Sequence, residues 1–323
     1  MITTHPTTKY RHVMRQENTL PTVTVAVSAL NEKKNITAFL ESVFIQREMG
    51  FVLERVIIIS DGSTDNTVAY ARALPDARVE VWEHSERIGK SSRLNELYAV
   101  VTSDILVQSD ADVVFAHPYV IRDIIAPLIF EKGVGMCGGH PTPVQANTFT
   151  EKAVNLTAEA YIPLRKTLRG GNNVLSVDGR ILAYKKELIK KITVPEDMIA
   201  NDMYTYFCCL TKGYAYRYVR SAVVYYRSPM DMKDQIRQNT RFASAPARMK
   251  RHFSEALVSY EYHIPRRVIL PRMIKVCLRH PILAGYIFVV NQYCKIKALF
   301  VEKHLTARWN MAWSTKRIHY NKK

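Results

Sequence analysis

Residues 55–63 carry the sequence RVIIISDGS, an apolar run that ends in the turn-forming residues Asp61, Gly62 and Ser63. A short continuous apolar run of this kind is typical of a strand that is buried on both faces of a parallel sheet. The stretch therefore predicts a central strand in an α/β fold.

Similar units lie on either side of this strand. A β-branched run at 22–28 (TVTVAVS) precedes apolar residues at helical spacing from Ile36 to Phe44, and Asn31 is a candidate helix cap between them. Further along, the pattern predicts a helix, a strand, a helix and a strand at residues 68–74, 79–82, 94–101 and 104–108. Four βα units in succession predict a parallel sheet with helices on both faces.

Composition limits the class of protein. With 323 residues, 47% of them hydrophobic and 23% charged, the chain can bury a sizeable core, so a disordered or collagen-like chain is excluded. The five cysteines form no C-x-x-C pair, which indicates neither a disulfide scaffold nor a structural zinc site. The first residues have no apolar stretch of signal-peptide length, so we expect a cytoplasmic protein.

The net charge of +17 is unevenly placed. Residues 1–213 hold 24 of the 46 Lys and Arg and 24 of the 29 Asp and Glu, so the whole excess lies in the remaining 22 and 5 of residues 214–323. A basic block interleaved with apolar residues can face anionic lipid, nucleic acid or an acidic substrate, or it can be a solvated surface.

Two carboxylates, Asp110 and Asp112, directly follow the predicted strand at 104–108. Such residues at i and i+2 supply hard oxygen ligands for Mg²⁺ or Mn²⁺, which can bridge a diphosphate. The alternative is that the triplet caps a helix beginning near Pro118 or lies solvated in a turn.

Further motifs change the balance between these two interpretations. After the strands come Ala29-Leu30-Asn31-Glu32, then residues 60–67 (SDGSTDNT), 89–95 (GKSSRLN) and 110–112 (DAD), followed by 177–180 (VDGR), 201–204 (NDMY), 212–214 (KGY) and 238–242 (QNTRF). In this order they resemble family 2 glycosyltransferases with the GT-A fold. The resemblance implies a mostly parallel sheet flanked by helices, to which this chain adds a basic helical C-terminal extension.

The resemblance also implies a division of the chain. It covers residues 21–245, with a nucleotide-sugar half at 21–115 and an acceptor half at 116–245. An N-terminal arm at 1–20 precedes it, and the basic extension at 246–323 follows.

In the nucleotide-sugar half, six residues are candidates for donor binding, and Asp110 of the acidic pair is one of them. Asp61 can accept the imide N–H of a uracil ring, with Gly62 turning the backbone past the base, or it can cap the next helix. Glu32, beside Asn31, can accept from a ribose hydroxyl or merely start a helix. Lys90 lies at a helix start, where a cation beside free N–H groups favours a pyrophosphate.

Asp202 is the candidate catalytic base, because its position resembles that of the family's base. At a helix N-terminus the dipole lowers a carboxyl pKa, whereas burial by Tyr204, Tyr206 and an acceptor raises it. The family pattern is Glu-Asp, whereas this chain has Asn-Asp at 201–202, so Asp197, in the pair at 196–197, is a rival.

Gln238 and Arg241 share a helix face at i and i+3, and Arg241 is a candidate for binding the diphosphate. Phe242 follows where the family has Trp, and it can stack on a sugar ring. The longest apolar candidate for a membrane span, Ile282–Val290, has only nine residues, which favours a single-addition enzyme over a chain-extending one.

The basic extension mixes cations with apolar residues at 266–279 and 282–301. Such segments can lie in the headgroup layer of an anionic membrane, which would make the protein peripheral on the inner face of the cell membrane. The alternative is a helical cap packed on the catalytic domain.

These observations predict the transfer of a sugar from a nucleotide-sugar, most of all a UDP-sugar, to a hydroxyl of a lipid-linked or polysaccharide acceptor in envelope or exopolysaccharide biosynthesis. The resemblance implies that the transfer inverts the anomeric centre. A sugar nucleotidyltransferase would need a Gly-rich, Arg-containing loop where residues 29–32 read ALNE. A nucleic-acid-binding protein explains the basic block but not the acidic motifs, so we expect no nucleic-acid partner. Whether His140 joins the metal site is left open.

Overall fold

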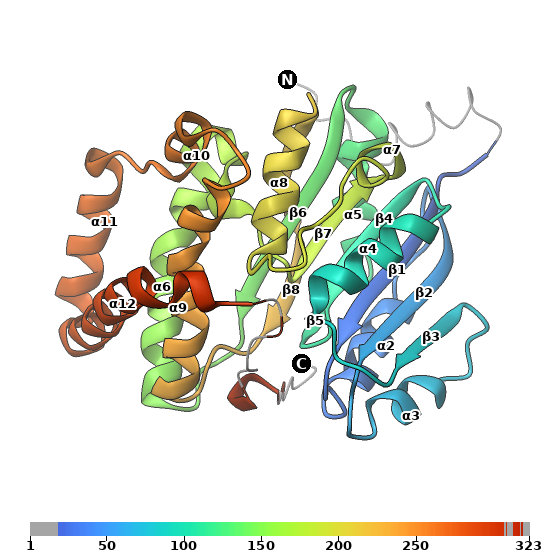
Figure 1. Ribbon diagram of the computed structural model, residues 1–323, viewed down its shortest axis with the longest axis horizontal. Helices are drawn as coiled ribbons and strands as arrows, with labels where there is room; N and C mark the ends of the chain where they lie inside the picture. The colour runs from blue at the N-terminus through green and yellow to red at the C-terminus, as the bar shows by residue number, and fades with distance from the viewer. Residues whose placement is uncertain (1–18, 307, 309–312, 317, 319–323) are drawn as a thin grey trace.

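The computed structural model describes residues 19–306, 308, 313–316 and 318 (Figure 1). In this part of the chain, eight strands form one mixed sheet in the order β3-β2-β1-β4-β7-β6-β8-β5. The strands are β1 (Thr22–Ala29), β2 (Val52–Asp61), β3 (Val79–His84), β4 (Ile105–Asp110), β5 (Val113–Phe115), β6 (Val134–Pro143), β7 (Ile181–Lys185) and β8 (Ala215–Tyr226).

The first half of the sheet is parallel, as the sequence predicts. β3, β2, β1 and β4 run in the same direction, so their carboxyl ends meet at one edge. Alternate residues of β2 enter two different cores: Val56 and Ile58 pack in one, and Ile57 and Ile59 pack in the other. The apolar run at 55–60 is therefore buried on both faces.

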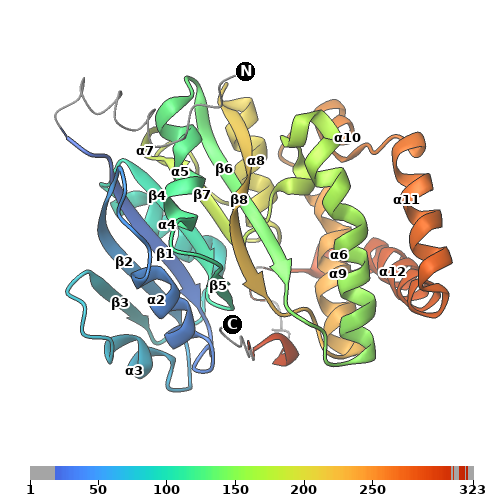
Figure 2. The same ribbon diagram turned by 180° about the vertical axis from the view of Figure 1, so that it is seen from behind.

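Helices cover both faces of the sheet. Figure 2 shows α2 (Ile36–Phe44) and α5 (Val120–Phe130) on one face, and α3 (Thr67–Arg72) contributes to the same core. α4 (Lys90–Val100) and α8 (Asn201–Thr211) cover the opposite face, where α7 (Lys186–Ile189) adds Leu188 and Ile189.

The second half departs from a purely parallel sheet. β7 pairs antiparallel with both β4 and β6, and β5 pairs antiparallel with β8. A mixed sheet of this kind, with helices on both faces, is the GT-A-like α/β architecture that the motifs predict.

The remaining helices lie beside the sheet (Figures 1 and 2). They are α6 (Phe149–Thr167), α9 (Met232–Met249), α10 (Glu255–Tyr262), α11 (Arg266–Arg279) and α12 (Pro281–Val301), with short 3-10 turns η1 (Leu168–Gly171), η2 (Val174–Ser176), η3 (Glu302–His304) and η4 (Trp313–Thr315). α12 packs on α9 and α6. None of the helices in the described residues is both long and apolar enough to cross a membrane.

The predicted division into domains stays a prediction. The expected boundary at residue 245 falls inside α9 (Met232–Met249). Most of the expected N-terminal arm, residues 1–18, lies outside the described residues.

Candidate functional site

The acidic pair lies at the carboxyl end of β4, which ends at Asp110. Lys90 at the start of α4 donates to Asp110 Oδ1 over 2.5 Å. The helix after the pair begins at Val120 and has Tyr119 as its N-cap, so the interpretation of the triplet as a cap for that helix was wrong. The pair instead joins the end of β4 to the short strand β5 (Val113–Phe115).

Burial and several neighbouring charges act on the carboxyl group of Asp112. Burial raises its pKa, and the charge of Asp110 raises it further, whereas Arg180, Lys316 and Lys90 act to lower it. A divalent cation relieves both causes of this shift, because it neutralises two carboxylates that repel each other in a poorly solvated place. The two side chains therefore fit a Mg²⁺ or Mn²⁺ site.

This site is incomplete as a protein-only metal centre. Within the described ranges, no group of three or more His, Cys, Asp and Glu side chains gathers as metal ligands. His140 consequently does not join Asp110 and Asp112 in such a group. A cation held by two carboxylates keeps positions for diphosphate oxygens and water, which is usual for Mg²⁺ at phosphate sites.

His140 lies elsewhere, on β6, where its Nδ1 hydrogen bonds with the Tyr218 hydroxyl over 2.6 Å. Burial lowers its pKa to about 4, and the charges of Lys166, Arg165 and Arg220 add to that effect. His140 is therefore neutral at physiological pH.

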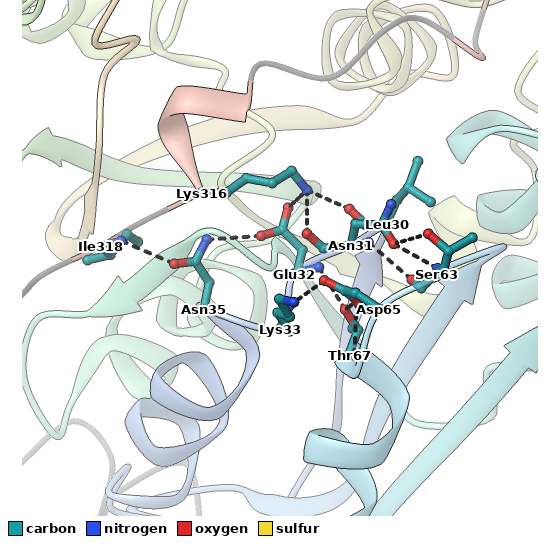
Figure 3. A network of polar contacts seen from close by, with 11 residues as sticks. Leu30, Asn31, Glu32, Lys33, Asn35, Ser63, Asp65, Thr67, Lys316 and Ile318 are labelled. Carbon is teal, nitrogen blue, oxygen red and sulfur yellow. Dashed lines mark hydrogen bonds and ion pairs between the residues drawn. The ribbon is translucent and has the colours of Figure 1, made fainter.

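Glu32 and the C-terminal segment form the polar network of Figure 3. Lys316 donates to Glu32 Oε1 over 2.5 Å and to the carbonyl oxygens of Leu30 and Asn31. The Asn35 amide donates to Glu32 Oε2 over 2.9 Å. Burial, followed by the charge of Asp112, raises the pKa of Glu32 to about 7, against the lowering effect of Lys316.

Asn31 ties two strand-end loops together. Its side chain accepts from the Thr64 N–H over 2.8 Å, and its own N–H donates to the Ser63 hydroxyl over 3.1 Å. Asn31 has a φ of 55°, in the left-handed region. The helix that follows is capped at Asn35, so the interpretation of Asn31 as its cap was wrong.

Asp61 is the last residue of β2, and hydrogen bonds fill most of the acceptor positions of its carboxylate. Its carboxylate accepts from the N–H groups of Ile88 and Gly89 over 3.0 and 2.9 Å, and from Arg93 Nε over 3.0 Å. A carboxylate has about four lone-pair positions, so about one stays available for a ligand donor. The next helix has Asn66 as its N-cap, so Asp61 is not a helix cap.

Gly62 allows this arrangement. Its φ is +76°, and a Cβ there would lie 2.9 Å from the backbone nitrogen of Arg87. Only glycine combines this backbone conformation with so close an approach.

Asp202 lies in the first turn of α8, as the sequence predicts. Burial and the charge of Asp178 raise its pKa, against a hydrogen bond from the Met203 N–H and the charges of Lys90 and Arg241. Burial therefore outweighs the helix N-terminus, and the carboxylate becomes a stronger base. Its Oδ2 accepts from the Gly179 N–H over 3.2 Å.

The rival base lies in a different environment. The Asp197 side chain is 57% exposed and pairs with Arg248 over 2.8 Å. Arg248 is buried and also binds Glu302 Oε1 over 2.7 Å. Asp197 thus belongs to a network that ties α9 to η3.

Arg241 connects the acidic pair to Asp202. Burial lowers its pKa, whereas Asp202, Asp110 and Asp112 each act to raise it. One partly buried guanidinium therefore interacts electrostatically with all three carboxylates. Gln238 lies one turn earlier on the same helix, α9, as the sequence predicts.

Three charged residues of the site were missed by sequence reasoning. Arg93 holds Asp61, and Lys316 holds Glu32. Arg180 pairs with Asp178 over 3.0 Å and lies 3.7 Å from the centre of the Tyr226 ring. Arg180 stands in the motif VDGR, which offers a signal, whereas Lys316 lies 284 residues from Glu32 and offers none.

Comparisons with known proteins give the family and the fold of similar proteins. A family model described as glycosyl transferase family 2 matches residues 24–193. The glucosyl-3-phosphoglycerate synthase of Mycobacterium tuberculosis is 27% identical over 141 residues, which are 40% of this chain and 41% of that relative. The match therefore spans less than half the length of the curated relatives.

Two solved structures show the same fold. The mannosyltransferase PcManGT of Pyrobaculum calidifontis, in complex with GDP-Man and Mn²⁺, aligns with a TM-score of 0.62 at 18% identity, over 92% of this chain and 93% of the other. The M. tuberculosis synthase with Mn²⁺, UDP-glucose and phosphoglyceric acid aligns with a TM-score of 0.54 at 18% identity, over 77% and 86%.

Proposed function

The chain belongs to glycosyl transferase family 2 and is a nucleotide-sugar-dependent glycosyltransferase, and on this premise we propose that it transfers a sugar from a UDP-sugar to an acceptor hydroxyl with inversion. The observation that carries the proposal is that the charge of Arg241 interacts with those of Asp202, Asp110 and Asp112 alike. The residues that would stabilise the leaving group, Asp110 and Asp112, and the residue that would take the proton, Asp202, then belong to one site.

In this proposal the donor lies along the carboxyl ends of β1, β2 and β4. Asp61 accepts the uracil imide N–H with its remaining lone pair, beside Gly62. Glu32 accepts a ribose hydroxyl, and Asn31 holds the loop that carries it. Lys90 already lies against Asp110, where it can bind a diphosphate oxygen.

Asp112 and Asp110 would hold Mg²⁺ or Mn²⁺, which neutralises the departing diphosphate. Arg241 adds a positive charge that interacts with both carboxylates, and Gln238 lies on the same helix face as Arg241. The similar mannosyltransferase structure holds Mn²⁺ with GDP-Man, and the similar synthase structure holds Mn²⁺ with UDP-glucose, which supports this choice of ions.

Asp202 would take the proton from the attacking hydroxyl. Burial raises its pKa, which makes it a better base than an exposed aspartate. Attack from the side of the base, opposite to the diphosphate, inverts the anomeric centre.

A panel of nucleotide-sugars tests the donor class. With Mn²⁺ present, a UDP-sugar at about one hundred times its Kd is expected to stabilise the protein by about 2.7 kcal/mol, which raises Tm by about 5 °C. Differential scanning calorimetry measures the shift. Stabilisation by GDP-sugars alone would show that the donor carries guanine in place of uracil. An unchanged Tm with every nucleotide-sugar would contradict the proposal.

We also propose that the acceptor is lipid-linked or a polysaccharide and that the enzyme works in the cytoplasm against an anionic membrane surface. α11 (Arg266–Arg279) has no buried residue. Large apolar side chains stay exposed on α11 and α12, among them Leu278 at 80% and Leu299 at 81%. Basic side chains lie between them, at 266, 267, 272, 275, 279, 295 and 297. This combination is typical of helices in the headgroup layer.

Vesicle sedimentation tests this surface. The protein is expected to sediment with phosphatidylglycerol vesicles at low salt and to be released at high salt, because the cations are screened. Leu278→Glu with Leu299→Glu should abolish sedimentation, whereas Tyr70→Glu, at an exposed apolar site on α3, should not change it. Equal recovery in the supernatant with and without vesicles would exclude the membrane proposal.

A further inference from the structure

Three basic side chains gather where the end of α6 meets β8. Arg165 and Lys166 lie in the last turn of α6, and Arg220 comes from β8. Arg220 Nη2 donates to the Lys166 carbonyl oxygen over 2.5 Å, which joins the two elements. These three residues are the basic cluster.

His140 and Tyr218 lie within reach of the cluster. All three cations act on His140, which remains neutral, and Arg165 and Arg220 act on Tyr218 as well. The hydrogen bond between His140 and Tyr218 fixes both rings beside the cations. The place is therefore an organised one with polar groups.

The negative charge nearby does not balance the cluster. Among the described residues, Asp178 is the carboxylate that pairs with the cluster, at 3.8 Å from Arg165 Nη2. The same carboxylate accepts from Arg180 Nη1 with both oxygens, over 3.1 and 3.0 Å. One negative charge is thus shared between two arginines, and the cluster keeps an excess of positive charge.

An unsatisfied donor points to a missing acceptor. Arg165 Nε is buried and has no hydrogen-bond partner in the described part of the chain. A buried N–H without an acceptor is unfavourable, and an anion at this place would satisfy it. Favourable contact of Arg165 and Lys166 with the C-terminal dipole of α6 explains two of the cations, but it explains neither Arg220 nor the unsatisfied Nε.

Arg165 links the cluster to the proposed base through Asp178. Asp178, which contacts Arg165, is followed in the chain by Gly179, whose N–H donates to Asp202 Oδ2 over 3.2 Å. A group bound at the cluster is therefore close to the place where the acceptor hydroxyl must lie.

We propose that Arg165, Lys166 and Arg220 bind a phosphate group of the acceptor and thereby place its hydroxyl at Asp202. The inference rests on the proposed function and narrows its acceptor to phosphate-bearing molecules. A phosphate, with a charge of almost −2 at neutral pH, matches three cations better than a singly charged carboxylate. Both a soluble phosphate ester and a lipid phosphate carry this group.

Calorimetric titration of inorganic phosphate tests the site. UDP and Mg²⁺ first saturate the donor site, so that phosphate reports on the cluster alone. Lys166→Gln with Arg220→Gln is expected to weaken phosphate affinity at least tenfold and to leave the Tm shift caused by UDP and Mg²⁺ unchanged. Lys132→Gln, at an exposed cation before β6, is the matched control and should bind phosphate as the natural protein does.

Competition then identifies the source of the phosphate. Displacement by glycerol 3-phosphate, but not glycerol, indicates a soluble ester, and displacement by a short-chain polyprenyl phosphate, but not polyprenol, indicates a lipid. Unchanged phosphate affinity in the double variant, or displacement by neither phosphorylated compound, would overturn the inference. Absence of a Tm shift with UDP in the natural protein would instead overturn the proposed function, so the two failures are distinct.

Discussion

Asp202→Asn is expected to lower the rate of sugar transfer about 10³-fold while nucleotide-sugar binding stays within about twofold of normal. Asparagine has the same shape and still accepts the Gly179 N–H, which donates to Asp202 Oδ2 over 3.2 Å in the natural protein. It cannot take up a proton from the acceptor. Single-turnover kinetics, with the donor Kd measured separately by calorimetry, tells loss of chemistry from loss of binding.

The same residue predicts a pH dependence. Because burial raises the pKa of Asp202, its active, deprotonated form is lost at a higher pH than for an ordinary aspartate as the solution is acidified. The rate of transfer by the natural protein should therefore fall as the pH is lowered through the raised pKa of Asp202, which gives an acidic limb in the pH–rate profile. The residual activity of Asp202→Asn should lack it.

Asp197→Asn is the matched control for this prediction. Its side chain is 57% exposed and pairs with Arg248, so we expect near-normal transfer with a small loss of stability. The assignment of the base would be wrong if Asp202→Asn kept near-normal transfer while Asp197→Asn lost it.

Asp112→Asn is expected to lower transfer about 10²- to 10³-fold and to abolish stabilisation by Mn²⁺ with UDP. Without metal, its Tm should be equal to or above that of the natural protein. The reason is that burial and the charge of Asp110 both disfavour the charged form of Asp112. The substitution removes this charge, and with it the desolvation cost and the repulsion. Calorimetry with and without Mn²⁺ measures both effects.

Asp104→Asn, at the opposite end of the same strand region, controls for general loss of carboxylate charge. Its side chain is 53% exposed and contacts Lys186, so metal-dependent stabilisation and transfer should both persist. A normal Mn²⁺ response in Asp112→Asn would contradict the metal assignment, whereas a large fall in its metal-free Tm would show that Asp112 is structural.

Much of the donor half follows from local sequence. The apolar run at 55–60 and its neighbours predict parallel strands, and the carboxyl ends of such strands meet at one edge. The polar residues Asp61 and Asp110 are the last residues of parallel strands, so their common position needs no knowledge of the rest of the chain. The helix containing Asp202 follows from its apolar spacing in the same way.

Partners and protonation depend on tertiary structure. Lys316 reaches Glu32 from 284 residues away, and Asp61 is held by Arg93 of α4, 32 residues further along the chain. No local pattern records these contacts, because they form only when the sheet has brought distant segments together. The direction of the pKa shift of Asp202 is decided there too, since the helix N-terminus is a local property but burial is a property of the whole fold.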